Sequence, residues 1–193
     1  MTKAELKKFY KAYGKAMGIK FYFPCWLHSL LTLATRKIPG KFRELMNPAI
    51  DAVECPKTLG KKLVMLSFEP GDQSVPWLRQ IEEAVEEAEH TRQIRRYVAK
   101  GGTVSGWYRD YFNPKSRGFC AIQEGAAKCA AAEVVFAATG KVPGPPDLSS
   151  YLVGTSGQQM ANDTYSDNIK KVLKMGRGSS TFESAAVAIR LID

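Results

Sequence analysis

The chain has 193 residues, which is enough for one domain with a hydrophobic core and additional arms. Its 28 lysines and arginines exceed its 19 aspartates and glutamates, so the formal net charge is +9. This charge excludes no fold, and it indicates a polyanion, an acidic membrane or an acidic protein as partner, although a basic protein without such a partner has the same composition.

The residue pattern argues against two classes of protein. The most apolar stretch, residues 21–33, contains Pro24 and His28 and is too short to span a membrane. The first lysines are spread through a helical pattern with no apolar segment after them, so no secretory leader is expected. Four cysteines form no close pair, and reduced thiols are expected at all of them: Cys25, Cys55, Cys120 and Cys129.

Three helices are predicted in the first third of the chain. Residues 3–18 carry apolar side chains at spacings of three and four, with lysines between them. A second helix is predicted at residues 24–36 and a third at residues 41–54, with a proline-glycine break between them. The short apolar run at residues 63–68 predicts a strand or an extended packed segment.

The strongest helical pattern covers residues 77–100. Glutamates fill its first half and cations fill its second half, which is the order that the helix dipole favours. An alanine-rich helix is predicted at residues 119–139. It should end at Gly140, because the prolines that follow cannot continue a helix. A polar, glycine-containing segment comes next, and a short helix is predicted at residues 168–175.

These elements predict a mainly α fold. We expect a compact helical core with extended N- and C-terminal arms and one short β segment near residues 62–68. The expected division is an N-terminal arm or helix at residues 1–20, a helical core domain at residues 21–148 and a C-terminal arm at residues 149–193.

No catalytic set is expected, so the chain is not predicted to be an enzyme, and no cofactor or metal is predicted. His28 and His90 each lie alone in a predicted helix, and no phosphate-binding glycine motif is present. Cys120 lies near a predicted helix start, which can lower the pKa of a thiol, but no histidine base is close to it in sequence. A cysteine-dependent enzyme using Cys120 is the weakest hypothesis. The glutamates of residues 82–89 fall on several faces of one helix, which favours a solvated surface over a metal site.

Nucleic-acid binding has more support. Arg92, Arg96 and Lys100 lie on one row of the predicted helix at spacings of four, and Arg95 lies one step round. Such cations neutralise phosphates, and aromatic rings can stack on unpaired bases. The stretch at residues 107–117 is rich in both kinds of side chain. Core packing with solvent-facing cations is an equally good interpretation of that stretch.

Four short segments follow one another between residues 56 and 178. They are Leu63-Val64-Met65-Leu66 with Gly71-Asp72-Gln73 and Pro76, then Ala88-Glu89-His90-Thr91-Arg92-Gln93-Ile94, then Val135-Phe136 with Thr139-Gly140-Lys141-Val142-Pro143, and last Asn162-Asp163-Thr164 through Asp167 to Gly176-Arg177-Gly178. Their order and spacing resemble the coat proteins of potyviruses and, more distantly, those of other flexuous filamentous plant RNA viruses.

The resemblance implies a helical core with two arms that bind neighbouring subunits in a helical filament, with genomic single-stranded RNA between them. It implies an RNA contact at Arg92, which stands where the family has an arginine. The family's aspartate position is Val134 here, with Glu133 one step before it, and the hydroxyl nearest the family's serine position is Thr58. The charge row and the resemblance together give six candidate RNA-binding residues: Arg92, Glu133, Thr58, Arg96, Lys100 and Arg95.

The expected function is therefore that of a viral coat protein. It would polymerise into a helical filament and enclose single-stranded RNA without reading its sequence, in the virion and the host cytoplasm. Its partners would be single-stranded RNA and further copies of the chain. No membrane partner is expected. The segment at residues 179–193 continues past the family's last motif and would form a longer arm. The alternative is a basic helical nucleic-acid-binding regulatory protein that does not polymerise.

Overall fold

The computed structural model describes residues 1–23, 57–59, 61–66, 68–148 and 154–175. This part of the chain contains α-helices, one short 3-10 helix and a small sheet, which confirms the predicted mainly α fold. The helices predicted at residues 24–36 and 41–54, and the tail after residue 175, lie outside the described residues.

Helix α1 (Lys3–Met17) begins at a capping box, in which the side chain of Thr2 accepts from the Glu5 amide and the Glu5 side chain accepts from Thr2. It ends at Gly18, whose φ of 61° lies in the left-handed region. Leu6, Phe9 and Tyr13 on one face are fully buried in the main hydrophobic core. The helix predicted at residues 3–18 is therefore present, and it packs into the core.

Three short strands form one sheet in the order β1-β3-β2. β1 (Lys20–Tyr22) runs parallel to β3 (Leu63–Met65), and β2 (Lys57–Leu59) runs antiparallel to β3. β3 is the predicted apolar run, and its Val64 is fully buried. The sequence did not predict β1 or β2, because three residues are too few to show an alternating pattern. The domain boundary expected after residue 20 falls inside β1.

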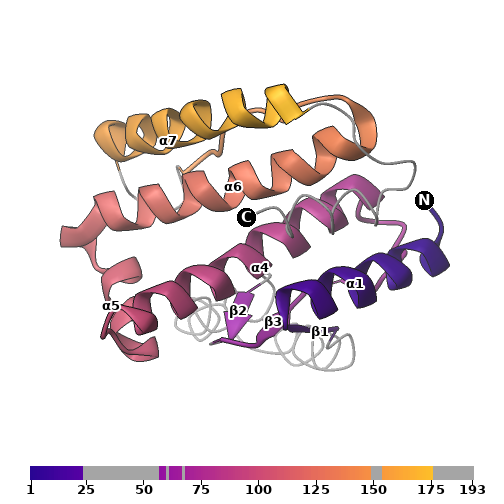
Figure 1. Cartoon of the computed structure of the whole chain (residues 1–193), viewed down its shortest axis with the longest axis horizontal. Helices are drawn as coiled ribbons and strands as arrows, with labels where there is room; N and C mark the ends of the chain where they lie inside the picture. Colours follow the sequence, from indigo (N-terminus) through magenta and orange to yellow (C-terminus); the bar gives the residue numbers. More distant parts are fainter. Residues whose placement is uncertain (24–56, 60, 67, 149–153, 176–193) are drawn as a thin grey trace, which may run out of the picture.

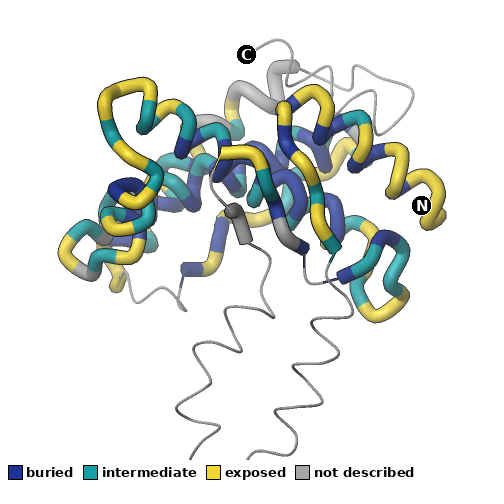
Figure 2. The backbone as a smooth tube through the Cα atoms, turned by 90° about the horizontal axis from the view of Figure 1, so that it is seen from below, coloured by how far each residue is buried: buried dark blue, intermediate teal, exposed yellow. Residues whose placement is uncertain are grey.

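Helix α4 (Trp77–Ala99) lies in the middle of the molecule, with α1 and the sheet on one side and α6 on the other (Figure 1). Most of its apolar stripe is buried, including Ile81, Ala84, Ala88 and Ile94, whereas Trp77 at the start of the helix is 36% exposed. Figure 2 shows the buried residues gathered toward the middle of the fold. This burial is the main force that holds α4 between its neighbours.

Helix α5 (Val104–Phe112) and a 3-10 turn (Pro114–Ser116) connect α4 to α6 (Arg117–Thr139). The Thr103 side chain caps α5 by accepting from the Gly106 amide at 3.0 Å. Gly140 ends α6 with a φ of 72°, as the glycine and the following prolines predicted.

Helix α7 (Gly154–Met175) lies along α6, on the side of α6 away from α4 (Figure 1). At Gly125 of α6, an added Cβ would lie only 2.7 Å from the Ala161 carbonyl oxygen of α7, so the two helices approach closely. The sequence predicted a helix only from residue 168 and an arm before it, and this was wrong for residues 154–167. The buried residues of that part, Gly157, Ala161 and Tyr165, recur every four positions but are mostly too small to give a hydrophobic signal.

None of the described helices combines the length and apolar character needed to cross a lipid bilayer. Cys120 and Cys129 are free thiols buried in the core, as expected for both. Cys25 and Cys55 lie outside the described residues.

Candidate nucleic-acid interface

Four of the six candidate residues lie on the second half of α4, and two lie elsewhere. Arg92, Arg95 and Arg96 lie in the last turns of α4 and Lys100 caps its C-terminal end, whereas Thr58 lies in β2 and Glu133 on α6. Arg95 lies one step round the helix from the row of Arg92, Arg96 and Lys100, and the surroundings of the four cations differ.

Arg95 holds three main-chain carbonyl groups together. Its Nε donates to the carbonyl oxygen of Lys61 at 2.8 Å, its Nη1 to that of Met17 at 2.6 Å and its Nη2 to that of Gly18 at 2.9 Å. Burial lowers the pKa of Arg95, but a guanidinium stays protonated at neutral pH. Arg95 therefore fastens the end of α1 and the turn before β3 to α4.

Arg92 forms an ion pair with a buried carboxylate on the same helix. Its Nε lies 3.0 Å from Oε1 and 2.9 Å from Oε2 of Glu89, whose residue surface is 2% exposed. The Arg92 side chain itself is 23% exposed. Removing Arg92 would leave a buried carboxylate without this partner, so part of its role is in the fold.

Arg96 and Lys100 are exposed at the end of α4 and form no ion pair with any residue that the structure describes. The contacts of Arg95 bring exposed lysines to the same end of the molecule. Arg95 binds the Lys61 carbonyl group, and the Lys20 amide donates to the Lys62 carbonyl oxygen at 2.8 Å. We call this set of exposed cations the basic corner, and its members are Lys20, Lys61, Lys62, Arg96 and Lys100.

The aromatic and basic stretch that follows α4 divides between core and surface. Trp107 and Tyr111 are buried, with their rings stacked at a centroid distance of 4.8 Å. Phe112 is 69% exposed, and its ring lies nearly parallel to that of half-buried Tyr108, at 6.4 Å and 9°. The core-packing interpretation therefore holds for one face of α5, and the other face carries exposed side chains.

Charged groups flank the exposed face of α5. The Arg109 side chain is 75% exposed and lies 3.2 Å from Oδ1 of Asp110. Asp110 also accepts from the hydroxyl of Tyr97 at 2.6 Å, and this bond lowers the pKa of its carboxyl group. Lys115 is exposed just beyond the helix. The Asp110 carboxylate is thus already engaged by Tyr97 and Arg109.

Glu133 does not lie near Arg92. Glu86 pairs with Lys128 at 2.7 Å and His90 lies 3.3 Å from Glu124, so α4 and α6 run antiparallel. This register places Arg92 near the start of α6, about three turns from Glu133. Thr58 pairs through its backbone with Val64. The structure therefore does not bring Arg92 and Glu133 into one pocket, and the side chain of Thr58 lies outside the described residues.

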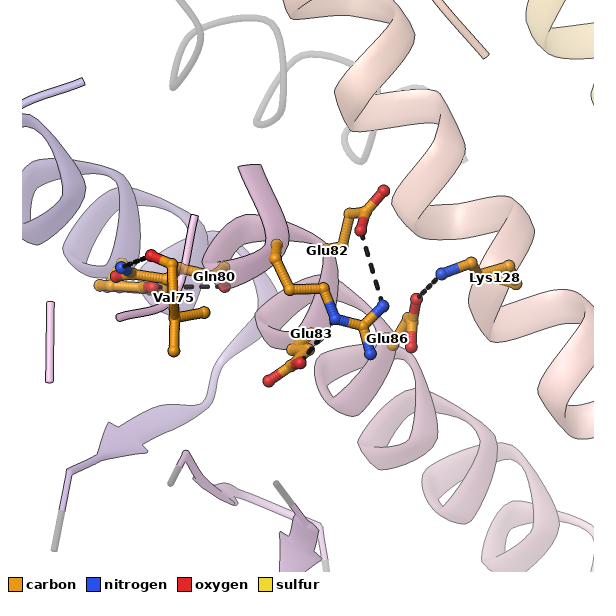
Figure 3. Close-up of polar contacts among 8 residues, drawn as sticks. Val75, Gln80, Glu82, Glu83, Glu86 and Lys128 are labelled. Carbon is orange, nitrogen blue, oxygen red and sulfur yellow. Dashed lines mark hydrogen bonds and ion pairs between the residues drawn. The ribbon is translucent and has the colours of Figure 1, made fainter. Parts of the chain in front are cut away.

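The glutamates at the start of α4 lie beside cations of the fold (Figure 3). Arg79 lies 2.7 Å from Glu83 and 3.7 Å from Glu82, and Lys128 of α6 lies 2.7 Å from Glu86. Burial raises the pKa of the Glu83 carboxyl group, against the attraction of Arg79. Ion pairs thus take up the acidic half of α4, in contrast to its exposed basic end.

The sequence did not identify a buried polar cluster between α4, α5 and α6. His90 and Glu124 are 6% and 8% exposed, with 3.3 Å between Nε2 and Oε1. Tyr111 donates to the same carboxylate, and Nδ1 of His90 lies 2.8 Å from Oε1 of Gln93. Only the position of His90 on the buried stripe of α4 could have indicated this cluster from sequence.

The electrostatics of this cluster favour a charged pair. Burial by itself would lower the pKa of His90, but Glu124 outweighs it and raises that pKa to about 10. Burial raises the pKa of Glu124, but His90, Tyr111 and Lys128 together lower it by more, so the net shift is downward. The pair therefore joins α4 to α6 as imidazolium and carboxylate.

Cys120 lies beside this cluster and is not an activated thiol. Burial, followed by the charge of Glu124, raises the pKa of its thiol to about 12. The idea that the helix start lowers this pKa is wrong, because the thiol is buried next to a carboxylate. The fold does bring His90 into the same cluster, although the two residues are far apart in sequence. Their common neighbour Glu124 keeps the sulfur protonated.

Comparison of the chain with protein-family models, with curated proteins and with solved structures finds no match.

Proposed function

We propose that this chain is a coat-type subunit that binds single-stranded RNA without reading its sequence and polymerises into a helical filament. The observation that carries the RNA part is the basic corner. Its cations are exposed, and the fold does not use Arg96 or Lys100 in any described ion pair. The filament part is supported by the four ordered motifs of the sequence.

The composition of the basic corner suits phosphate groups. Exposed lysine and arginine side chains neutralise phosphates and release counterions, whatever the base sequence. The lysines come from β1 and from the turn before β3, and the other cations from α4, so Arg95 presents them together. A protein that must cover a whole genome needs contacts of this kind, because they are the same at every nucleotide.

The exposed face of α5 suits unpaired bases. Phe112 and Tyr108 offer nearly parallel rings, and Arg109 offers a planar cation beside them. Stacking on such groups is independent of sequence but requires bases that are not paired. This face follows the basic corner along the chain, which favours single-stranded over duplex RNA as the ligand.

The proposal assigns different roles to the six candidate residues. Arg96 and Lys100 contact phosphate, and Arg92 contributes at the edge of the surface through its exposed part. Arg95 acts by holding the corner in shape. Glu133 has no part in the proposed contact, because it lies about three turns from Arg92 on the neighbouring helix. The Thr58 side chain lies outside the described residues, so Thr58 stays a candidate from the sequence alone.

Filaments require a contact that joins two different surfaces of the subunit and does not close into a ring. The apolar segment at residues 183–192 has the composition for such a contact and lies outside the described residues. Negative-stain electron microscopy of the purified full chain, with and without single-stranded RNA, tests this part. Filaments containing nuclease-protected RNA are expected. Monodisperse monomer at high concentration, with no bound RNA, would contradict the proposal.

The RNA part is tested with a fluorescent oligouridylate in anisotropy titrations at several salt concentrations. The double variant Arg96→Gln/Lys100→Gln should bind more weakly than the unaltered chain. Its matched control is Lys141→Gln/Lys170→Gln, which removes the same charge near the ends of α6 and α7. An equal loss of RNA affinity in both variants would show that the basic corner is not the RNA-binding surface. Salt-sensitive RNA binding by particles that stay monomeric or dimeric would support the non-polymerising alternative.

A further inference from the structure

Helix α1 carries a row of lysines that the functional proposal above does not use. Lys3, Lys7, Lys11 and Lys15 follow one another at spacings of four, and Lys8 lies beside them. All five are exposed. Positions four apart on a helix are neighbours about 6 Å apart along its axis, so the row is a line of adjacent positive charges.

This row has little compensation in the fold. The only acid of α1 is Glu5, which is bound to Thr2 in the helix cap. Lys3 lies 3.6 Å from Glu69, and no ion pair is found for Lys7, Lys11 or Lys15 among the described residues. Like charges at this spacing destabilise a helix, so the arrangement costs the isolated protein some stability.

The packing of α1 fixes the direction in which the row faces. Phe9 and Tyr13 are fully buried on the opposite side of the helix, with their rings stacked at 5.4 Å. The hydroxyl of Tyr10 donates to the Gln80 carbonyl oxygen at 3.3 Å. The helix therefore cannot rotate about its axis, and so move the lysine row to another side, without opening the core.

The row leads to the basic corner. Helix α1 ends at Gly18, and Arg95 binds the carbonyl groups of Met17 and Gly18. Two residues later Lys20 begins β1, beside Lys62. Arg95 thus links the C-terminal end of α1 to the last turn before the cations at the end of α4.

We propose that the lysine row of α1 is a second phosphate-binding surface, along which the backbone of the bound single-stranded RNA continues from the basic corner. This inference rests on the proposed function. The uncompensated charge selects a polyanion, and the even spacing along a straight helix suits a repeating chain of phosphates. The row itself consists of lysines, which bind phosphate through charge and do not distinguish bases, so the contact is independent of sequence.

The experiment measures RNA affinity of the full chain against salt concentration, with an oligouridylate of about twenty nucleotides. On single strands the logarithm of the binding constant falls with the logarithm of salt by about 0.7 for each phosphate contact. Lys11→Gln/Lys15→Gln should therefore reduce this slope by about 1.4. Lys11→Arg/Lys15→Arg keeps the charge and should retain the slope of the unaltered chain.

The control is again Lys141→Gln/Lys170→Gln, which removes two lysines from outside α1 and the basic corner. It should leave the slope within error of the unaltered chain. Circular dichroism melts check folding, and the Tm of the glutamine variant should be equal or higher, because repulsion within α1 is relieved.

The outcomes separate this inference from the proposed function. Suppose that the unaltered chain binds RNA and that Lys11→Gln/Lys15→Gln has the same salt dependence of binding as the control. The lysine row is then not a phosphate site, and the proposal for the basic corner is unaffected. If the salt dependence of binding becomes weaker in Lys11→Gln/Lys15→Gln but not in Arg96→Gln/Lys100→Gln, the lysine row binds phosphate and the basic corner does not. An unaltered chain with no salt-dependent RNA binding would overturn both.

Discussion

The cations of α4 occupy two different environments, although they lie within three turns of one helix. His90 and Arg95 face other elements, and each of them binds groups of the fold. Arg96 and Lys100 face solvent at the end of the helix and bind none of the described acids. Residues of similar charge therefore contribute to stability in one region and remain available for a ligand in the other, and only the face of the helix distinguishes them.

The largest effect is expected where a buried charge loses its partner. Glu124→Ala should lower the free energy of unfolding by about 3–5 kcal/mol, because the His90 imidazolium would stay buried without its carboxylate. Urea unfolding followed by circular dichroism measures this loss. Asp163→Ala on the exposed face of α7 is the control and should change stability by less than about 0.5 kcal/mol. A loss below about 1 kcal/mol for Glu124→Ala would contradict the charged pair.

The same pair predicts how stability depends on pH. The folded pKa of His90 is raised from 6.5 to about 10, so its contribution is fully present below pH 6.5 and is lost as pH rises toward 10. The folded pKa of Glu124 is lowered, so its contribution is present above the ordinary value of 4.5 and is lost as pH falls through the lowered pKa.

Stabilisation by the pair should consequently be greatest between about pH 4.5 and 6.5 and should decline toward pH 10. Chemical unfolding at a series of pH values, with His90→Gln/Glu124→Gln for comparison, isolates this contribution. The difference between the two proteins should shrink as pH rises. A difference that is constant from pH 6 to 10 would show that the pair is not charged.

A smaller effect is expected at Arg95, which is only partly buried. Arg95→Met removes the hydrogen bonds to the carbonyl groups of Met17, Gly18 and Lys61 and should cost about 1–3 kcal/mol. Arg95→Lys keeps the charge but cannot reach three acceptors at once, so it should restore only part of the loss. Hydrogen exchange should quicken at the amides of Gly18 and Lys20. Full recovery with lysine would mean that charge rather than geometry is what matters there.

The smallest effect on stability is expected at the exposed end of the helix. Arg96→Gln/Lys100→Gln should change the free energy of unfolding by less than about 0.5 kcal/mol, because no described group of the fold depends on either side chain. Thermal melts of this variant and of Arg95→Met, measured together, compare the two regions directly. A large loss of stability in the glutamine variant would show that these cations also belong to the fold.

The main helices could be predicted because their signals are local. The apolar periodicity of α1 and α4, the Thr2 cap and the stops at Gly18 and Gly140 are all legible within a few residues of sequence. The first half of α7 could not be predicted in this way. Its contact with α6 depends on small residues such as Gly125 and Ala161, which allow close approach without a strong hydrophobic pattern.

The candidate site was only partly predictable. Arg96 and Lys100 could be identified from charge and spacing alone, because the role of an exposed cation does not depend on a contact with a particular residue of the fold. The lysines that complete the basic corner could not, because β1 and the turn before β3 reach α4 only through folding. The motif comparison also suggested Glu133, and the antiparallel packing of α6 on α4 takes that residue away from Arg92.

The sequence by itself determined the net charge, the order of the main helices and the concentration of cations at the end of α4. Tertiary structure alone decided which of those cations remain exposed. Arg95 finds its acceptor on Met17 across 78 residues of chain, and His90 finds Glu124 on another helix. The physical reason is that hydrogen bonds and ion pairs depend on distance in space, whereas a sequence pattern records only distance along the chain.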